Sequence, residues 1–141
     1  MPKTLGSEDL ARILPHAYPF VLIDRVTDYE EGKSLTAIKN ITANEWAFED
    51  GQASDMYPET LLIEAAAQAA LVLYKVTAKD NGLAVVGKIK SEFERSLTIG
   101  DQVLFKSRVV KIISSMGISK VELSQNDQSF ANVQVYFSIL K

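Results

Sequence analysis

The residue with the clearest chemical potential in this sequence is Glu64, a single carboxylate within an otherwise apolar helical run from Leu61 to Ala70. Burying an ionised side chain without a partner is costly, so Glu64 must reach a polar opening or be paired. Gln68 follows one helical turn later, which places both polar side chains on the same face of a helix. The pair indicates either a site for one ligand or a polar stripe that reaches solvent.

The composition narrows the chemistry in which Glu64 can take part. The 141-residue chain has no cysteine and a single histidine, His16, which excludes thiolate chemistry and a histidine-rich metal site. The net charge of −3 and the absence of a Lys/Arg cluster argue against a nucleic-acid partner. The sequence shows no signal-peptide pattern and no apolar stretch long enough to span a bilayer. We therefore expect a cytoplasmic protein with no membrane partner.

The elements that must position Glu64 form a helix-rich part followed by strands. Ser7 to Leu14 predicts a short helix, and Phe20 to Tyr29 with Ser34 to Thr42 predicts a hairpin. Pro58, which is favoured in a first turn, and the segment from Asp80 to Gly82 delimit the long helix that carries Glu64. Strand-like runs, separated by turn residues, predict further strands at 83–93, 102–113, 117–125 and 129–140.

One long helix among antiparallel strands predicts an α+β fold in which an antiparallel sheet wraps around that central helix. The helix is apolar over most of its circumference from Leu61 to Leu73, so it should be buried on most sides. No repeat or linker interrupts the chain, and its length suits one core. We expect residues 1–141 to form a single domain with the hot-dog fold.

Four sequence blocks, in the same order, resemble the FabZ-type 3-hydroxyacyl-[acyl-carrier-protein] dehydratases. The first block runs from Leu14 to Val26 and reads LPHAYPFVLIDRV. The other blocks are Lys39 to Glu45, Pro58 to Gln68, and Phe93 to Gln102. The resemblance implies a hot-dog dimer whose sheets join side by side, with acyl tunnels at the interface. It also implies a substrate acyl chain on phosphopantetheine, carried by acyl carrier protein or coenzyme A, and no cofactor.

The sequence departs from the family pattern at the loop before the central helix. In the family, a Gly-His-Phe-Pro loop supplies the catalytic His, and a Met-Pro-Gly-Val turn opens the helix. Here residues 51–54 read GQAS and residues 57–60 read YPET. The segment is also one residue shorter than the family pattern, so the His position falls on Gly51 or Gln52. Neither residue can act as a general base: the carboxylate Glu64 is kept and the imidazole is missing.

Candidate roles follow from the resemblance. Dehydration needs a base for the C2 proton and an acid for the departing hydroxide, and in the family a His and a Glu from two protomers share this work. Glu64 is therefore a candidate catalytic residue, and Gln52 is a second one at the loop position. The candidate substrate-binding residues are Gln68, Glu59 and Gly51. Glu59 replaces a Gly whose N–H lies at the helix N-terminus, where backbone donors polarise the thioester oxygen.

Three functions are compatible with these residues. The first is a dehydratase-like subunit that is incomplete alone and is completed by a His-bearing homologue, as a heterodimer in place of a homodimer. The second is an acyl-thioester hydrolase in which Gln52 polarises the thioester and Glu64 is the nucleophile or base. The third is a non-catalytic acyl-binding or structural subunit. His16 is expected to satisfy backbone groups near the first turn and not to replace the missing base.

Overall fold

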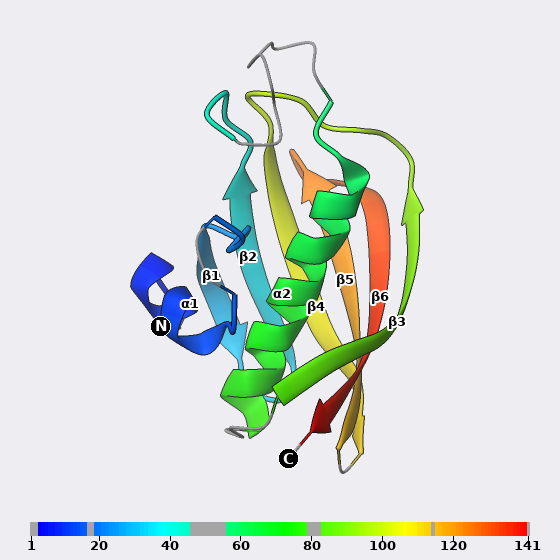
Figure 1. Cartoon of the computed structure of the whole chain (residues 1–141). Helices are drawn as coiled ribbons and strands as arrows, with labels where there is room; N and C mark the ends of the chain where they lie inside the picture. The colour runs from blue at the N-terminus through cyan, green and yellow to red at the C-terminus, as the bar shows by residue number, and fades with distance from the viewer. Residues whose placement is uncertain (1–2, 17–18, 46–55, 79–82, 114, 141) are drawn as a thin grey trace.

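A single antiparallel sheet curves around one long helix in this protein (Figure 1). The structure, a computed structural model, describes residues 3–16, 19–45, 56–78, 83–113 and 115–140. Its strand order is β1-β2-β4-β5-β6-β3, and every neighbouring pair is antiparallel. The elements are α1 (Ser7–Ile13), β1 (Arg25–Glu30), β2 (Ser34–Asn40), α2 (Glu59–Ala78), β3 (Leu83–Phe93), β4 (Gln102–Ile113), β5 (Met116–Gln125) and β6 (Gln128–Leu140).

Helix α2 is the centre of the hydrophobic core. Four of its alanines, Ala65, Ala66, Ala69 and Ala70, are completely buried, and such small side chains let the strands approach the helix closely. By length and composition alone α2 would qualify as a membrane span, but 56% of its most apolar stretch is buried within the fold. This burial on most sides agrees with the even spread of apolar residues around the helix.

Strand β1 begins later than the sequence pattern suggested. The apolar run predicts a strand from Phe20, whereas the ladder begins at Arg25. The difference has a tertiary cause, because the side chain of Gln68 on α2 binds the backbone of the preceding segment at Phe20 and Leu22. Residues 20–22 therefore lie along the helix instead of in the sheet.

The β5–β6 hairpin shows two local features that fix its shape. Its turn residues, Asn126 and Asp127, both adopt positive φ, 51° and 64°, as in a two-residue type I′ turn. Further along β5, a Cβ added to Gly117 would lie 2.4 Å from Cζ of Phe137 on β6. The Phe137 ring packs edge-on against Tyr74 of α2 at 5.0 Å between centroids, so glycine at position 117 makes room for a contact between sheet and helix.

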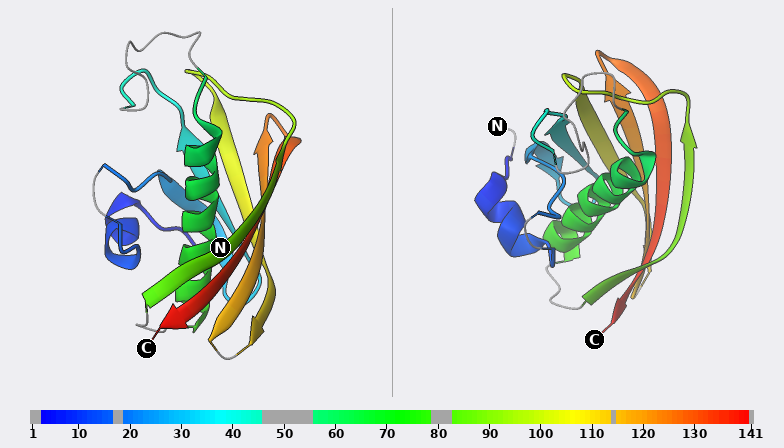
Figure 2. Two further views of the ribbon diagram at one scale, coloured as in Figure 1. Left: turned by 45° about the vertical axis from the view of Figure 1, so that its right-hand side comes forward. Right: turned by 45° about the horizontal axis from the view of Figure 1, so that its top comes forward.

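The two edges of the sheet differ in how they are covered. At the β1 edge, Leu5 and Val26 exchange backbone hydrogen bonds of 3.0 and 2.9 Å, so the N-terminal segment caps that edge. The β3 edge, across α2 from β1 in the right-hand view of Figure 2, has no neighbouring strand within the described residues. Val85 and Val86 on β3 are 40% and 46% exposed. Long exposed edges with apolar side chains are typical places for a second chain to bind.

Candidate functional site

Glu64 is held by two side chains on one of its carboxylate oxygens. Its Oε1 lies 3.0 Å from Nε2 of His16 and 3.3 Å from Nε2 of Gln68. The Glu64 and His16 side chains are 31% and 24% exposed, so the pair is partly screened from water and still reachable. A carboxylate with a fixed oxygen and partial exposure is suited to proton transfer.

Gln68 connects this carboxylate to the backbone of the N-terminal segment. It is 1% exposed, donates from Nε2 to the Phe20 carbonyl at 2.8 Å, and accepts at Oε1 from the Leu22 N–H at 2.9 Å. Both N–H groups of its amide are then engaged, one by Phe20 and one by Glu64. Gln68 thus positions Glu64, and its assignment as a substrate-binding residue stays a prediction.

His16 does not take the place that the sequence suggested. We expected it to satisfy backbone groups, whereas its Nε2 contacts Glu64 and its Nδ1 is buried with no hydrogen bond among the described residues. An ionised carboxylate only accepts hydrogen bonds, so Nε2 carries a proton in this contact. The cause is again the segment held along α2 by Gln68, which brings the ring to Glu64.

An apolar cavity of about 190 Å³ adjoins these polar groups. Its walls come from α2, from the inner face of β6 and β3, and from the turn at Pro15, and its apolar lining is Ala67, Leu71, Ala84, Val86, Val135 and Phe137. Glu64, Gln68 and His16 also line it. Since Ala84 and Val86 belong to the edge strand β3, the cavity lies beside the uncovered edge of the sheet.

Comparison with known proteins identifies the family. A family model described as the FabA-like domain matches residues 14–134. The chain is 38% identical over 138 residues to the 3-hydroxyacyl-[acyl-carrier-protein] dehydratase FabZ of Clostridium kluyveri, covering 95% of each. The chain belongs to the FabA-like family. The FabZ dehydratase of Haemophilus ducreyi is 41% identical over 124 residues, covering 84% of this chain and 79% of that one.

A solved structure shows the same fold at much lower sequence identity. The dehydratase heterocomplex ApeI:P from Xenorhabdus doucetiae superposes with a TM-score of 0.78 at 16% identity, over 100% of this chain and 92% of that one. The resemblance to FabZ-type dehydratases and the hot-dog fold, both expected from the sequence, are confirmed by these comparisons.

Of the other candidate residues, the structure describes Glu59, which it does not bring to Glu64. Glu59 is the first residue of α2 and is exposed, and it does not line the cavity of Glu64. Gly51 and Gln52 lie outside the described residues, as do Trp46 and Phe48 of the same segment. The roles proposed for Glu59, Gly51 and Gln52 remain predictions.

A buried polar cluster flanking that segment was not foreseen from the sequence. Lys39 is 4% exposed, its Nζ lies 3.0 Å from Oε1 of Glu45, and it stands 5.3 Å from the ring centroid of Tyr57. Burial, as the larger cause, and the nearby Glu45 carboxylate raise the pKa of Tyr57 above its ordinary value. The sequence feature that could have indicated this cluster is Lys39, a charged residue that lies between the apolar residues Ile38 and Ile41.

Proposed function

We propose that this chain is a FabZ-type dehydratase subunit that binds the acyl chain of a phosphopantetheine thioester, on acyl carrier protein or coenzyme A. The supporting observation is the position of Glu64, held at Oε1 by His16 and Gln68 beside an apolar cavity. An acyl chain fits apolar walls, and a carboxylate at their rim is suited to act on the polar end of the substrate. Acid–base chemistry of this kind needs no cofactor.

The proposed subunit is incomplete alone. During dehydration a base takes the C2 proton, the C3–O bond breaks, and an acid donates a proton to the departing hydroxyl so that water leaves. Loss of one acid–base group typically costs 10²- to 10⁴-fold in rate, roughly 3–5 kcal/mol of barrier. The only imidazole of this chain, His16, is engaged by Glu64 through Nε2, so we assign it to positioning. We propose that a His-bearing homologue supplies the second catalytic group.

A second chain is also expected from the shape of the site. The cavity of about 190 Å³ is smaller than the roughly 300–1,000 Å³ typical of ligand pockets, and it lies along the uncovered edge strand β3. A chain placed against that edge would extend the walls. We expect a dimer burying at least about 1,200 Å² in total. Light scattering that shows only the 15.6 kDa species at micromolar concentration would contradict it.

The deciding experiment is an acyl-thioester assay with an inactivated partner. A His-bearing FabZ homologue whose own helix Glu is replaced by Gln keeps its loop His but cannot use its own carboxylate. Dehydration of a 3-hydroxyacyl thioester that appears only after mixing the two chains would support a composite site. The Glu64→Gln variant should abolish this activity, while Glu122→Gln, the same change at an exposed position on β5, should retain it.

Each alternative function has its own result in the same assay. Robust dehydration by the pure chain alone would refute partner dependence. Thioester hydrolysis by the pure chain that Glu64→Gln removes would establish the hydrolase with Gln52 and Glu64. Acyl binding without turnover in any mixture would indicate a non-catalytic subunit. We place the protein in the cytoplasm as one hot-dog domain, in keeping with a chain that has no cysteine.

A further inference from the structure

The Phe137 ring, which forms part of the wall of the Glu64 cavity, lies directly over Gly117 of the neighbouring strand. A Cβ built on Gly117 would lie 2.4 Å from Cζ, 2.6 Å from Cε2 and 3.1 Å from Cε1 of this ring. Carbon atoms are in favourable contact at about 3.5–4.0 Å, so these separations are too short for a real side chain. The far end of the ring therefore occupies the place that a side chain at position 117 would take.

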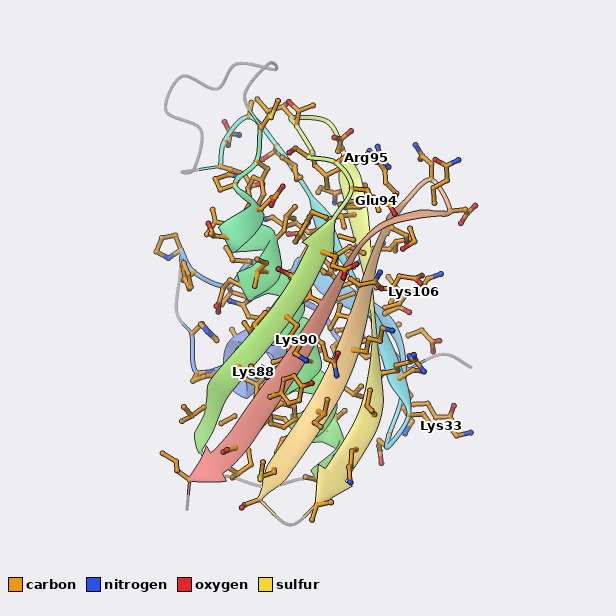
Figure 3. All side chains as sticks on the ribbon, turned by 90° about the vertical axis from the view of Figure 1, so that its right-hand side faces the viewer. Lys33, Lys88, Lys90, Glu94, Arg95 and Lys106 are labelled. Carbon is orange, nitrogen blue, oxygen red and sulfur yellow. The ribbon has the colours of Figure 1, made fainter. Side chains whose placement is uncertain are left out.

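The cavity lies on the other side of Phe137. Gly117 pairs with Phe137, and Phe137 pairs with Val86, so the three residues form one row across β5, β6 and β3. Figure 3 shows these strands side by side, with β6 in the middle. Val86 lines the cavity together with Ala84 of the same strand, whereas Gly117 is not among its lining residues. The ring thus covers β5, and the cavity is the space left beside it over β3.

The packing around the Phe137 ring leaves it one direction in which to move. Tyr74 of α2 is 3% exposed and packs edge-on against the ring at 5.0 Å between centroids, which closes the helix side. Val135 and Ile139, the neighbours of Phe137 on the same face of β6, are 1% and 5% exposed and close both directions along the strand. A side chain at position 117 would close the β5 side as well, so the ring would turn toward β3.

A ring turned toward β3 would take up most of the cavity. The cavity has a volume of about 190 Å³, and a cavity of about 150 Å³ already accepts a benzene molecule. Protein interiors are closely packed, so a displaced side chain has to use whatever free space adjoins it. For the Phe137 ring that free space is the cavity beside Glu64.

We infer that Gly117 sets the capacity of the acyl cavity, because the absence of a side chain at this position lets the Phe137 ring withdraw over β5. Gly117 is a positioning residue: it acts through Phe137 and does not line the cavity itself. The inference rests on the proposed function, in which this cavity holds the acyl chain. It makes the longest accepted acyl chain depend on a residue that the chain does not touch.

Xenon tests the effect of Gly117 on the cavity without any substrate, because xenon enters apolar cavities of this size. Under xenon pressure, methyl NMR spectra of the wild type should show shifts at Ala84 and Val86, and Gly117→Ala should remove most of these shifts. Gly87→Ala is the matched control: it adds the same methyl group to β3, where no described atom lies within 4 Å of the added Cβ, and it should leave the shifts unchanged.

A second substitution shows whether Gly117 acts through the ring. Phe137→Leu removes the ring and should enlarge the cavity. In the Phe137→Leu background, Gly117→Ala should therefore have no further effect on the xenon shifts, because the added methyl group no longer meets a ring. Loss of the effect in the double variant separates displacement of the ring from a general loss of stability.

Alkyl chain length tests the consequence for the substrate. S-alkyl coenzyme A thioethers from butyl to dodecyl are suitable probes, because they have neither a thioester to hydrolyse nor a hydroxyl group to eliminate. Isothermal titration calorimetry reports their affinities, and each methylene group that enters the cavity should strengthen binding about fourfold. Gly117→Ala should lower the chain length at which affinity stops rising and bind the longest accommodated chain at least about tenfold more weakly. Phe137→Leu should raise this chain length.

The inference would be overturned by unchanged xenon shifts in folded Gly117→Ala, or by an effect of Gly117→Ala that persists in the Phe137→Leu background. A uniform loss of affinity at every chain length would also overturn it. If Gly117→Ala does not fold, Phe137→Leu decides the matter, because an unchanged limit on chain length would overturn the inference. By contrast, wild-type protein that takes up xenon as expected but binds none of the thioethers would refute the proposed acyl binding and leave the effect of Gly117 on the cavity standing.

Discussion

Replacing Gln68 by Met should destabilise the protein far more than the loss of a surface hydrogen bond. Met is close to Gln in length and volume, so the change removes the amide with little change in packing. Gln68 is 1% exposed, and its amide forms hydrogen bonds with the Leu22 N–H, the Phe20 carbonyl and the Glu64 carboxylate. The substitution therefore removes one hydrogen bond from each of these three groups, and Glu64 keeps its contact with His16.

The expected magnitude follows from the burial of those groups. Leu22 is 3% exposed, so its N–H loses the bond to Gln68 in a place that water reaches poorly, which costs about 1–3 kcal/mol. The Phe20 carbonyl belongs to a residue that is 37% exposed and can be hydrated, so its loss adds about 0.5–1 kcal/mol. We expect the free energy of unfolding to fall by about 2–4 kcal/mol in all.

Urea denaturation followed by circular dichroism measures this change, at one fixed protein concentration because the proposed dimer would make the measured stability depend on concentration. Gln102→Met is the matched control, since Gln102 donates to Asn40 at 2.8 Å on the exposed surface. It should alter the free energy of unfolding by less than about 0.5 kcal/mol. If Gln68→Met also stayed within about 0.5 kcal/mol of the wild type, the amide would not be what holds residues 20–22 against α2.

Three further substitutions have expected outcomes. His16→Ala should lower kcat of the mixed dimer about 10- to 100-fold with little change in KM, because it releases Glu64 from its position; an unchanged kcat would exclude that role. Gly117→Ala should lower the free energy of unfolding in urea by about 1–3 kcal/mol, since its Cβ would meet the Phe137 ring, and a neutral result would show that the ring moves freely. The pKa of Tyr57 is raised in the folded protein above its ordinary value of 10.0. Tyr57 therefore contributes stability that is fully present below pH 10.0 and is lost as the pH rises toward the pKa of the folded state. The wild type should therefore lose up to about 1.4 kcal/mol per pH unit above pH 10 relative to Tyr57→Phe, and equal slopes would refute this.

Most of the fold was predictable because its signals are local. The long helix follows from a continuous apolar run closed by Pro58 and by Asp80 to Gly82, and it spans Glu59–Ala78 in the structure. Strand β6 is predicted by the strict alternation of apolar and polar residues along it. The turn before it is predicted by Asn126 and Asp127, because Asn and Asp tolerate positive φ. These elements need no knowledge of the rest of the molecule.

The features that were not predicted depend on contacts between distant segments. The start of β1 is set by Gln68, which lies 46 positions from Leu22. The contact of His16 with Glu64 arises from the same capture of the N-terminal segment, and no local pattern reports it. Glu64 itself could be selected from the sequence because a carboxylate in an apolar helix is anomalous wherever the helix packs.

The buried cluster of Lys39, Glu45 and Tyr57 has a consequence for how this scaffold can change. Glu45 and Tyr57 stand on either side of residues 46–55, and Lys39 holds both of them near one buried point. The Tyr57 N–H also donates to the Leu97 carbonyl at 2.7 Å, which fixes the chain just before α2. Because these contacts hold both flanks of residues 46–55, we expect a change in the length of that segment to leave Glu64 in place. The position of the Glu64 carboxylate on α2 is therefore expected to be independent of the length and sequence of the segment between Glu45 and Tyr57.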